Sequence, residues 1–131
     1  MSNYSVVATE DVAAIHQLYG HQSHCIDSGR QQDWAQTFTD GGEFHSPSYP
    51  EPVVGFDDLA AFAARFFAAA EAADEVHRHV LTNLVVEAVD ESALTVHGYL
   101  QIVATARGGD SRLVRMTTVT DHVVRVGEEW K

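Results

Sequence analysis

Two side chains of this 131-residue sequence have the types and the setting for proton transfer. Asp27 stands at the end of a predicted helix, where the negative end of the helix dipole disfavours ionisation of a carboxyl group. If Asp27 also faces an apolar cavity, desolvation raises its pKa further. Such a group can act as a general acid or base near neutral pH. The alternative is a structural aspartate that hydrogen-bonds the next turn of the chain.

His79 lies on a predicted strand, where His77, His79, Leu81 and Asn83 share one face by two-residue alternation. If that face lines a pocket, His79 and Asn83 both point into it. An Asp27–His79 pair could then move a proton from one substrate atom to another. Dehydration, cyclisation, isomerisation and epoxide opening all need such a step. The alternative is a hydrogen-bonded histidine in a polar patch.

Further polar and aromatic side chains could orient a substrate. His97, Tyr99 and Gln101 share one face of the next predicted strand, and Tyr99 there could donate to a developing oxyanion. That face could instead be exposed or form an interface. Tyr49 flanks a proline-rich loop and could cover the mouth of a pocket. The predicted substrate-binding residues are Trp34, Tyr49, Phe62, Asn83, His97 and Tyr99.

A metal site is the competing chemical hypothesis. The spacing of His77 and His79 puts two imidazoles on one side of a strand, as in some zinc and iron sites. No carboxylate or third histidine stands at a fixed spacing beside them. The sequence also lacks a phosphate-binding glycine loop and a nucleophile elbow. We therefore expect a reaction without metal or cofactor.

Three helices are predicted in the first 75 residues. The first begins near Thr9, which could cap it, and ends near Ser28-Gly29, where glycine suits a left-handed cap. A short helix is predicted over about 32–38 and a long one, with an Ala- and Phe-rich apolar stripe, over about 56–73. Between them, a short strand is predicted over 43–46, and three prolines within 47–52 predict a loop or lid.

Long strands rich in Val, Thr and Ile are predicted over 77–89, 93–107 and 111–126, joined by hairpin turns. The last residues look like the start of one more strand. Helices followed by a meander of antiparallel strands favour an α+β fold. The length fits one domain over residues 1–131.

The element order and several local segments resemble the SnoaL-like and nuclear transport factor 2-like superfamily. The resembling segments, spread over essentially the whole chain, are 15–19, 26–30, 33–41, 54–59, 79–83 and 128–131. The resemblance implies a cone-shaped fold, in which about three N-terminal helices pack on a curved, mostly antiparallel sheet. It also implies a homodimer, with strand faces that carry Leu113 and Met116 as the contact. This superfold hosts many chemistries, so the resemblance is weaker for the reaction.

Among catalytic members, the chain is most similar to scytalone dehydratase. Asp27 and Asp33-Trp34 hold the places of that enzyme's aspartate and of its Lys-Asp-Trp segment, and His79 that of its strand histidine. The second catalytic histidine of that enzyme falls near Ala106. The carboxylate base of ketosteroid isomerase falls near Ser46. Neither reaction therefore transfers directly.

The resemblance implies a dehydratase, cyclase or isomerase for a small, largely apolar, oxygenated ring compound. Such a reaction would suit polyketide, antibiotic or other natural-product biosynthesis. The alternative is a noncatalytic module of the same fold that binds a small ligand or supports assembly.

Charge and cysteine content narrow the choice of partners. Lys and Arg number 8 and Asp and Glu 19, for a net charge of −11. Nucleic acid and anionic membranes are disfavoured, because their phosphates would be repelled. The single cysteine, Cys25, is predicted to be buried and fits a cytoplasmic setting. Residues 1–5 contain no basic region, so no signal peptide is expected, and no apolar run is long enough to span a bilayer.

Overall fold

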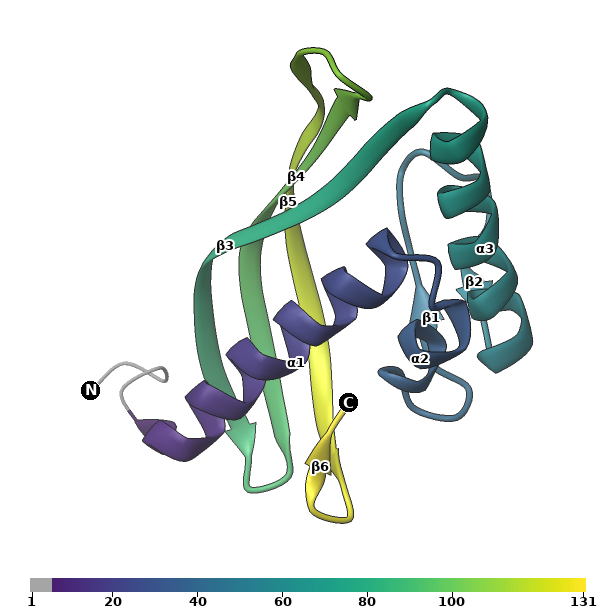
Figure 1. Cartoon of the computed structure of the whole chain (residues 1–131). Coiled ribbons are helices and arrows are strands. Elements are labelled where there is room, and N and C mark those ends of the chain that lie inside the picture. Colours follow the sequence, from purple (N-terminus) through teal and green to yellow (C-terminus); the bar gives the residue numbers. More distant parts are fainter. Residues whose placement is uncertain (1–5) are drawn as a thin grey trace.

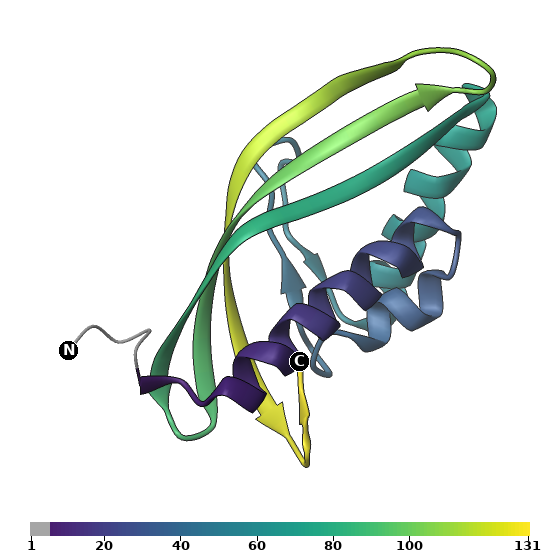
Figure 2. The same ribbon diagram turned by 60° about the vertical axis from the view of Figure 1, so that its left-hand side comes forward.

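The computed structural model describes residues 6–131, in which helices lie along the concave side of a strongly curved antiparallel sheet (Figures 1 and 2). The helices are α1 (Thr9–Asp27), α2 (Gln31–Gln36) and α3 (Phe56–Ala72). The main sheet has the order β3-β4-β5-β6, formed by β3 (Glu75–Asp90), β4 (Ala93–Ala106), β5 (Ser111–Val126) and β6 (Glu129–Trp130). The α+β cone expected from the sequence is confirmed.

The ends of the elements differ from the sequence expectation in small ways. Thr9 is the first helical residue of α1 and not its cap; extended Ala8 precedes it, with no side-chain capping bond. Gly29 has a φ of 77° and closes α1 in the expected left-handed conformation. A strand that was not predicted, β2 (Val53–Val54), pairs with β1 (Glu43–Phe44) across the proline loop.

Residues 1–5, on which the signal-peptide expectation rests, lie outside the described part of the chain. No helix within residues 6–131 is both long enough and apolar enough to cross a membrane.

A β-bulge bends β3 in its middle. The pairing of β3 with β4 skips between Thr82 and Val85, and Asn83 takes a positive φ of 58°. The strand turns sharply at this region (Figure 1). A Cβ on Gly98 of β4 would lie 2.6 Å from a terminal methyl of Leu84, so a larger residue there would force the Leu84 side chain to move. A bulge increases local twist and re-aims the side chains that follow it.

The bend divides the concave side into two hydrophobic clusters. In the first cluster, the first half of α1 packs on the part of the sheet beyond the bulge. The buried residues of this cluster are Ile15, Tyr19, Val86, Leu94, Val96, Val123 and Trp130. The end of α1 packs with α2 and α3 in the second cluster, formed by Cys25, Ile26, Trp34, Ala35, Leu59 and Ala63. Cys25 is fully buried, as predicted. Phe66 of α3 packs against this second cluster and contacts the ring of His79.

A buried polar pair fixes α1 to β5. The Tyr19 hydroxyl donates to Asp121 Oδ2 at 2.6 Å, and Asp121 faces the concave side opposite Val96. Burial raises the pKa of the Asp121 carboxyl, and the hydrogen bond from Tyr19 offsets part of that rise. Burial also raises the pKa of the Tyr19 phenol, with the nearby Asp121 adding to the effect. No local pattern in the sequence pairs these two residues.

The raised pKa of Asp121 predicts how stability depends on pH. The stability that the Asp121 carboxyl contributes is fully present below its unfolded pKa of about 3.9 and is lost as pH rises through the folded pKa. Asn at this position cannot ionise. In urea unfolding between pH 4 and pH 7, wild type should therefore lose stability relative to Asp121→Asn as pH rises. The exposed Asp110→Asn serves as the control, and a stability difference that does not change with pH would contradict the prediction.

Candidate active site

Asp27 and His79 are in direct contact, where the end of α1 meets the middle of β3. Asp27 Oδ1 lies 2.7 Å from His79 Nδ1, and Asp27 Oδ2 accepts the backbone N–H of His79 at 2.9 Å. Both side chains are largely covered, with 17% and 15% of their surface exposed. Because β3 is an edge of the sheet, Asp27 occupies an N–H group that such an edge leaves unpaired.

This two-point contact gives the two residues different roles. A carboxylate that accepts from Nδ1–H places the lone pair of a neutral imidazole on Nε2. No residue within 6–131 hydrogen-bonds Nε2 of His79. His79 is therefore the group able to exchange a proton with a substrate. Asp27 holds the ring and its tautomer, which differs from the sequence expectation of a carboxyl that itself acts as acid or base.

Aromatic packing from α3 confines the imidazole. The ring of Phe66 lies 4.7 Å from that of His79 and 5.7 Å from that of His77, measured between centroids. Gly29 lets α3 approach α1 closely, because a Cβ there would lie 3.0 Å from the Phe67 ring. The close docking of α3 thus fixes an apolar wall beside the Asp27–His79 pair.

A small cleft opens beside Asp27, and His79 is not among its lining residues. It has about 310 Å³ of unfilled space, which includes space open to solvent, so it is not an enclosed cavity. Its lining residues come from the end of α1, from α3 and from the start of β3: Asp27, Phe66, Phe67, Ala70, Glu71, Glu75, Val76 and His77.

His77 and His79 each contact a different carboxylate. His77 Nε2 lies 3.1 Å from Glu75 Oε1, whereas His79 binds Asp27. Glu75 also accepts from Arg112, and the hydrogen bonds from Arg112 and His77 lower its pKa to about 2. Within residues 6–131, no three ligating side chains gather closely enough to hold a metal ion.

Three of the aromatic residues predicted to bind substrate come together opposite the sheet. Trp34 stacks on Phe62 with centroids 5.9 Å apart, and Tyr49 meets the same ring edge-on at 5.4 Å. Phe44 completes the group, 5.0 Å from Phe62. We refer to Trp34, Phe44, Tyr49 and Phe62 as the aromatic wall. Its part in substrate binding remains a prediction.

The other three predicted binding residues lie elsewhere. Residues directly opposite in a ladder share a face. His79 is opposite Ile102, so the even-numbered residues of β4 face the concave side there, whereas His97 and Tyr99 face the convex side. Asn83 is exposed at the bulge, where the alternation that would align it with His79 is broken. The expectation that Asn83, His97 and Tyr99 line the pocket is therefore wrong, and the exposed-face alternative fits His97 and Tyr99.

Arg115 is a concave-face residue that sequence reasoning missed. It is opposite Ile102, which is itself opposite His79, so the three side chains form one row across β3, β4 and β5. Its guanidinium donates to the hydroxyls of Ser46, at 3.4 Å, and Ser48 in the proline loop. The available signal was a basic residue at an alternating position of a Val- and Thr-rich strand, but its partners depend on two strand registers.

Sequence comparison agrees with this fold. Residues 7–131 match the family model described as SnoaL-like domain. The chain belongs to the SnoaL-like domain family. The resemblance to this superfamily that was drawn from local segments is thus confirmed. No curated protein sequence matches this SnoaL-like chain.

Solved structures of the same fold include Aln2 from a Streptomyces species, 24% identical with a TM-score of 0.86, over 95% of this chain and 87% of that one. ActVI-ORFA from Streptomyces coelicolor is 25% identical with a TM-score of 0.81, over 93% and 91%. A protein from Catenulispora acidiphila in complex with S-DNPA is 24% identical with a TM-score of 0.78, over 92% and 86%.

The two-point contact predicts the tautomer of His79 in this SnoaL-like domain. In Asp27→Asn, the amide oxygen must face the backbone N–H of His79, because that group can only donate. The amide NH2 then faces Nδ1, which must accept, so the ring proton moves to Nε2. Nitrogen-15 NMR of the ring at pH 8 should show mainly Nδ1–H in wild type and mainly Nε2–H in the variant.

Exposed His16 on α1 serves as the internal reference for this experiment, since it should keep the same ring shifts in both proteins. The same His79 tautomer in both proteins would contradict the assignment of Asp27 as the residue that sets the ring.

Proposed function

We propose that this protein is a cofactor-independent acid/base enzyme that moves a proton within a small, largely apolar, oxygenated ring compound. The observation that carries the proposal is the two-point contact of Asp27 with His79. It leaves Nε2 as a base of fixed direction beside the apolar ring of Phe66. A base held in this way needs no rearrangement before it reacts.

The chemical step follows from the contact. His79 Nε2 takes a proton from a carbon beside a substrate carbonyl, and the electron pair of that C–H bond forms an enolate. The imidazolium that results is stabilised by the Asp27 carboxylate, as in other Asp–His arrangements. Return of the proton to another carbon gives isomerisation. Return to a leaving hydroxyl releases water and gives dehydration. Attack of the enolate carbon on a second carbonyl, whose oxygen takes the proton from the imidazolium, gives cyclisation.

The substrate class is argued from the walls of the site. The aromatic wall offers flat apolar surface on which a ring compound can stack. The net charge of −11 disfavours nucleic acid and anionic lipid as partners. The structure of the Catenulispora acidiphila protein with S-DNPA supports a small-molecule ligand for this fold. We place the reaction in polyketide or related natural-product biosynthesis in the cytoplasm.

Proton exchange into 2-tetralone, a bicyclic ketone with acidic C–H bonds next to its carbonyl, tests the base directly. In deuterated buffer, wild type should speed loss of those proton signals. Asp27→Asn and His79→Gln should slow the enzymatic rate by about 10²–10⁴-fold, the range that a general base contributes. His97→Gln, on the convex face, is the matched control and should exchange like wild type.

The outcomes separate two classes of function. Exchange that is equally fast in wild type and His79→Gln removes His79 as the base. If 2-tetralone binds but no variant and no wild-type sample promotes exchange, the noncatalytic ligand-binding module becomes the better account.

We also propose that the protein is a homodimer that pairs through the convex face of the sheet. This face carries exposed apolar side chains on three adjacent strands: Val80, Val85, Tyr99, Leu113, Met116 and Val124. Leu113 and Met116 are 57% and 53% exposed. An apolar patch of this kind on a soluble protein marks an interaction surface.

Light scattering should give wild type a mass near twice the chain mass of 14.4 kDa. The double variant Leu113→Glu/Met116→Glu should be monomeric, because two buried, unpaired carboxylates per chain would cost more than a dimer interface of this kind supplies. Val54→Glu, on exposed β2, is the control and should stay dimeric. Monomeric wild type at micromolar concentration would refute the dimer.

A further inference from the structure

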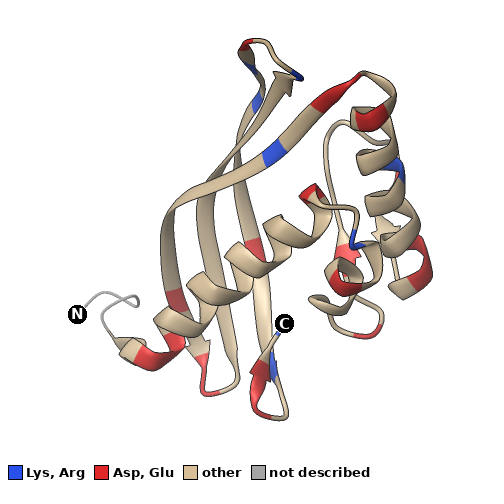
Figure 3. Ribbon diagram, viewed as in Figure 1, with Lys and Arg blue, Asp and Glu red and all other residues tan. Residues whose placement is uncertain are grey.

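Arg115 brings a positive charge to the concave side of the sheet without a carboxylate partner. Most of the charged side chains in the structure are acidic (Figure 3). The guanidinium groups of Arg107, Arg112 and Arg125 each contact a carboxylate. Within residues 6–131, Arg115 is in none of the ion pairs, as is also true of Arg30, Arg65 and Arg78. A guanidinium carries a positive charge, so the partly buried Arg115 side chain can offer that charge to a ligand.

The register places this charge opposite the proton-transferring histidine. His79, Ile102 and Arg115 are successive members of one row across three strands, and all three face the concave side. Two inter-strand spacings separate the backbones of His79 and Arg115 by about 10 Å. A compound of two fused rings lying on Ile102 would reach Nε2 at one end and the guanidinium at the other.

The present partners of Arg115 are exchangeable. Ser46 and Ser48 accept hydrogen bonds from the guanidinium through neutral hydroxyls. A carboxylate forms two parallel, charge-assisted bonds with the same group, which are roughly twice as strong as neutral ones. The proline loop, which carries Ser46 and Ser48, is also held by the edge-on contact of Tyr49 with Phe62. A ligand carboxylate could therefore displace the hydroxyls while the loop stays closed over the aromatic wall.

We infer that Arg115 binds a carboxylate of the substrate and so places the ring with its reacting atom at His79. The inference rests on the proposed function and narrows its substrate class to ring compounds that carry a carboxylic acid at the end remote from the reacting carbon. Arg115 is in this account a substrate-binding residue and takes no part in proton transfer. Its role is to set the distance between the bound acid and Nε2.

Calorimetric binding of 2-naphthoate and 2-naphthamide tests the inference, because the two probes share a ring system and differ in charge. Wild type should bind the acid at least about tenfold more tightly than the amide, as a charge-assisted pair predicts. Arg115→Gln should lose that preference. Arg78→Gln changes the net charge equally on the convex side of β3 and should keep it. Arg115→Lys, with the charge but not the paired geometry, should keep part of it.

Three results would overturn the inference: equal affinity of wild type for the two probes, no binding of either probe, or a preference for the acid that survives in Arg115→Gln. Circular-dichroism melting checks that this variant is folded, and Arg115→Lys answers the question if it is not.

Failure of the proposed function looks different from failure of the inference. If neither wild type nor Asp27→Asn promotes exchange of 2-tetralone, yet both bind 2-naphthoate more tightly than 2-naphthamide, the carboxylate site at Arg115 is supported and the protein is a binding module. If exchange depends on His79 but naphthoate has no advantage, the enzyme stands and Arg115 has another role.

Discussion

The carboxylate of Asp27 binds His79 at two atoms, the backbone nitrogen and Nδ1 of the ring, and much of the molecule is arranged around that contact. It occupies one backbone N–H on the edge of β3 and joins the last residue of α1 to the sheet. The turn at Gly29 follows two residues later and admits Phe67 of α3. Phe66, one residue away on the same helix, then covers the imidazole. One interaction thus links the end of a helix, an edge strand and the wall of the site.

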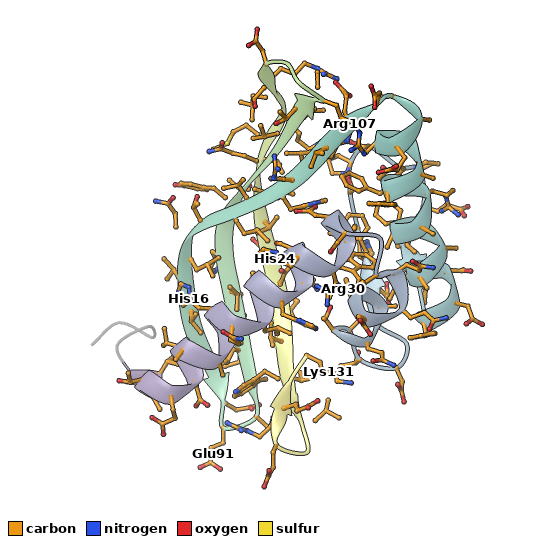
Figure 4. The ribbon with its side chains drawn as sticks, in the orientation of Figure 1. His16, His24, Arg30, Glu91, Arg107 and Lys131 are labelled. Atoms are coloured by element: carbon orange, nitrogen blue, oxygen red, sulfur yellow. The ribbon has the colours of Figure 1, made fainter. Side chains whose placement is uncertain are left out.

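The bulge in β3 is the second constraint. It lets one sheet serve both as support for a hydrophobic core with α1 and as the floor of an open site beneath α3. Tyr19 and Asp121 stand on the core side of this division, and His79 and Arg115 on the other. The far hairpin is anchored as well, since Arg107 contacts Glu71 and Asp74 at the end of α3 (Figure 4). Polar contacts therefore hold the sheet to the helices on both sides of the bulge, through Tyr19 and Asp121 on one side and through Arg107 on the other.

Local patterns predicted the long helices and strands, but they missed β2 and did not predict which face of each strand is concave. Helical spacing predicted α1 and α3 to within a few residues, and the turns between Val- and Thr-rich segments predicted β3, β4 and β5. The resemblance placed Asp27 and His79 in one site, but it did not predict that they contact each other directly. Alternation says which residues of a strand share a face, but not which face is concave. His97 and Tyr99 were misplaced for that reason.

Two other residues show where single-chain reasoning ends. Asn83 breaks the alternation by adopting a positive φ at the bulge, and the next residue, Leu84, packs against Gly98 of the neighbouring strand. Arg115 gains meaning only from two registers taken together, and the pairing of β4 with β5 shifts just after Ile102. Such pairings arise from packing between distant segments, and no local pattern encodes them.

The central claim is that His79, set by Asp27, meets the reacting end of a ring compound on the concave side. A crystal structure with bound 2-naphthol, which mimics the enol of 2-tetralone, tests it most directly. The account predicts the ligand oxygen or its neighbouring ring carbon within about 3 Å of His79 Nε2, the range for proton transfer, while Asp27 keeps both of its bonds to His79. A ligand bound away from His79, or an imidazole released from Asp27, would contradict it.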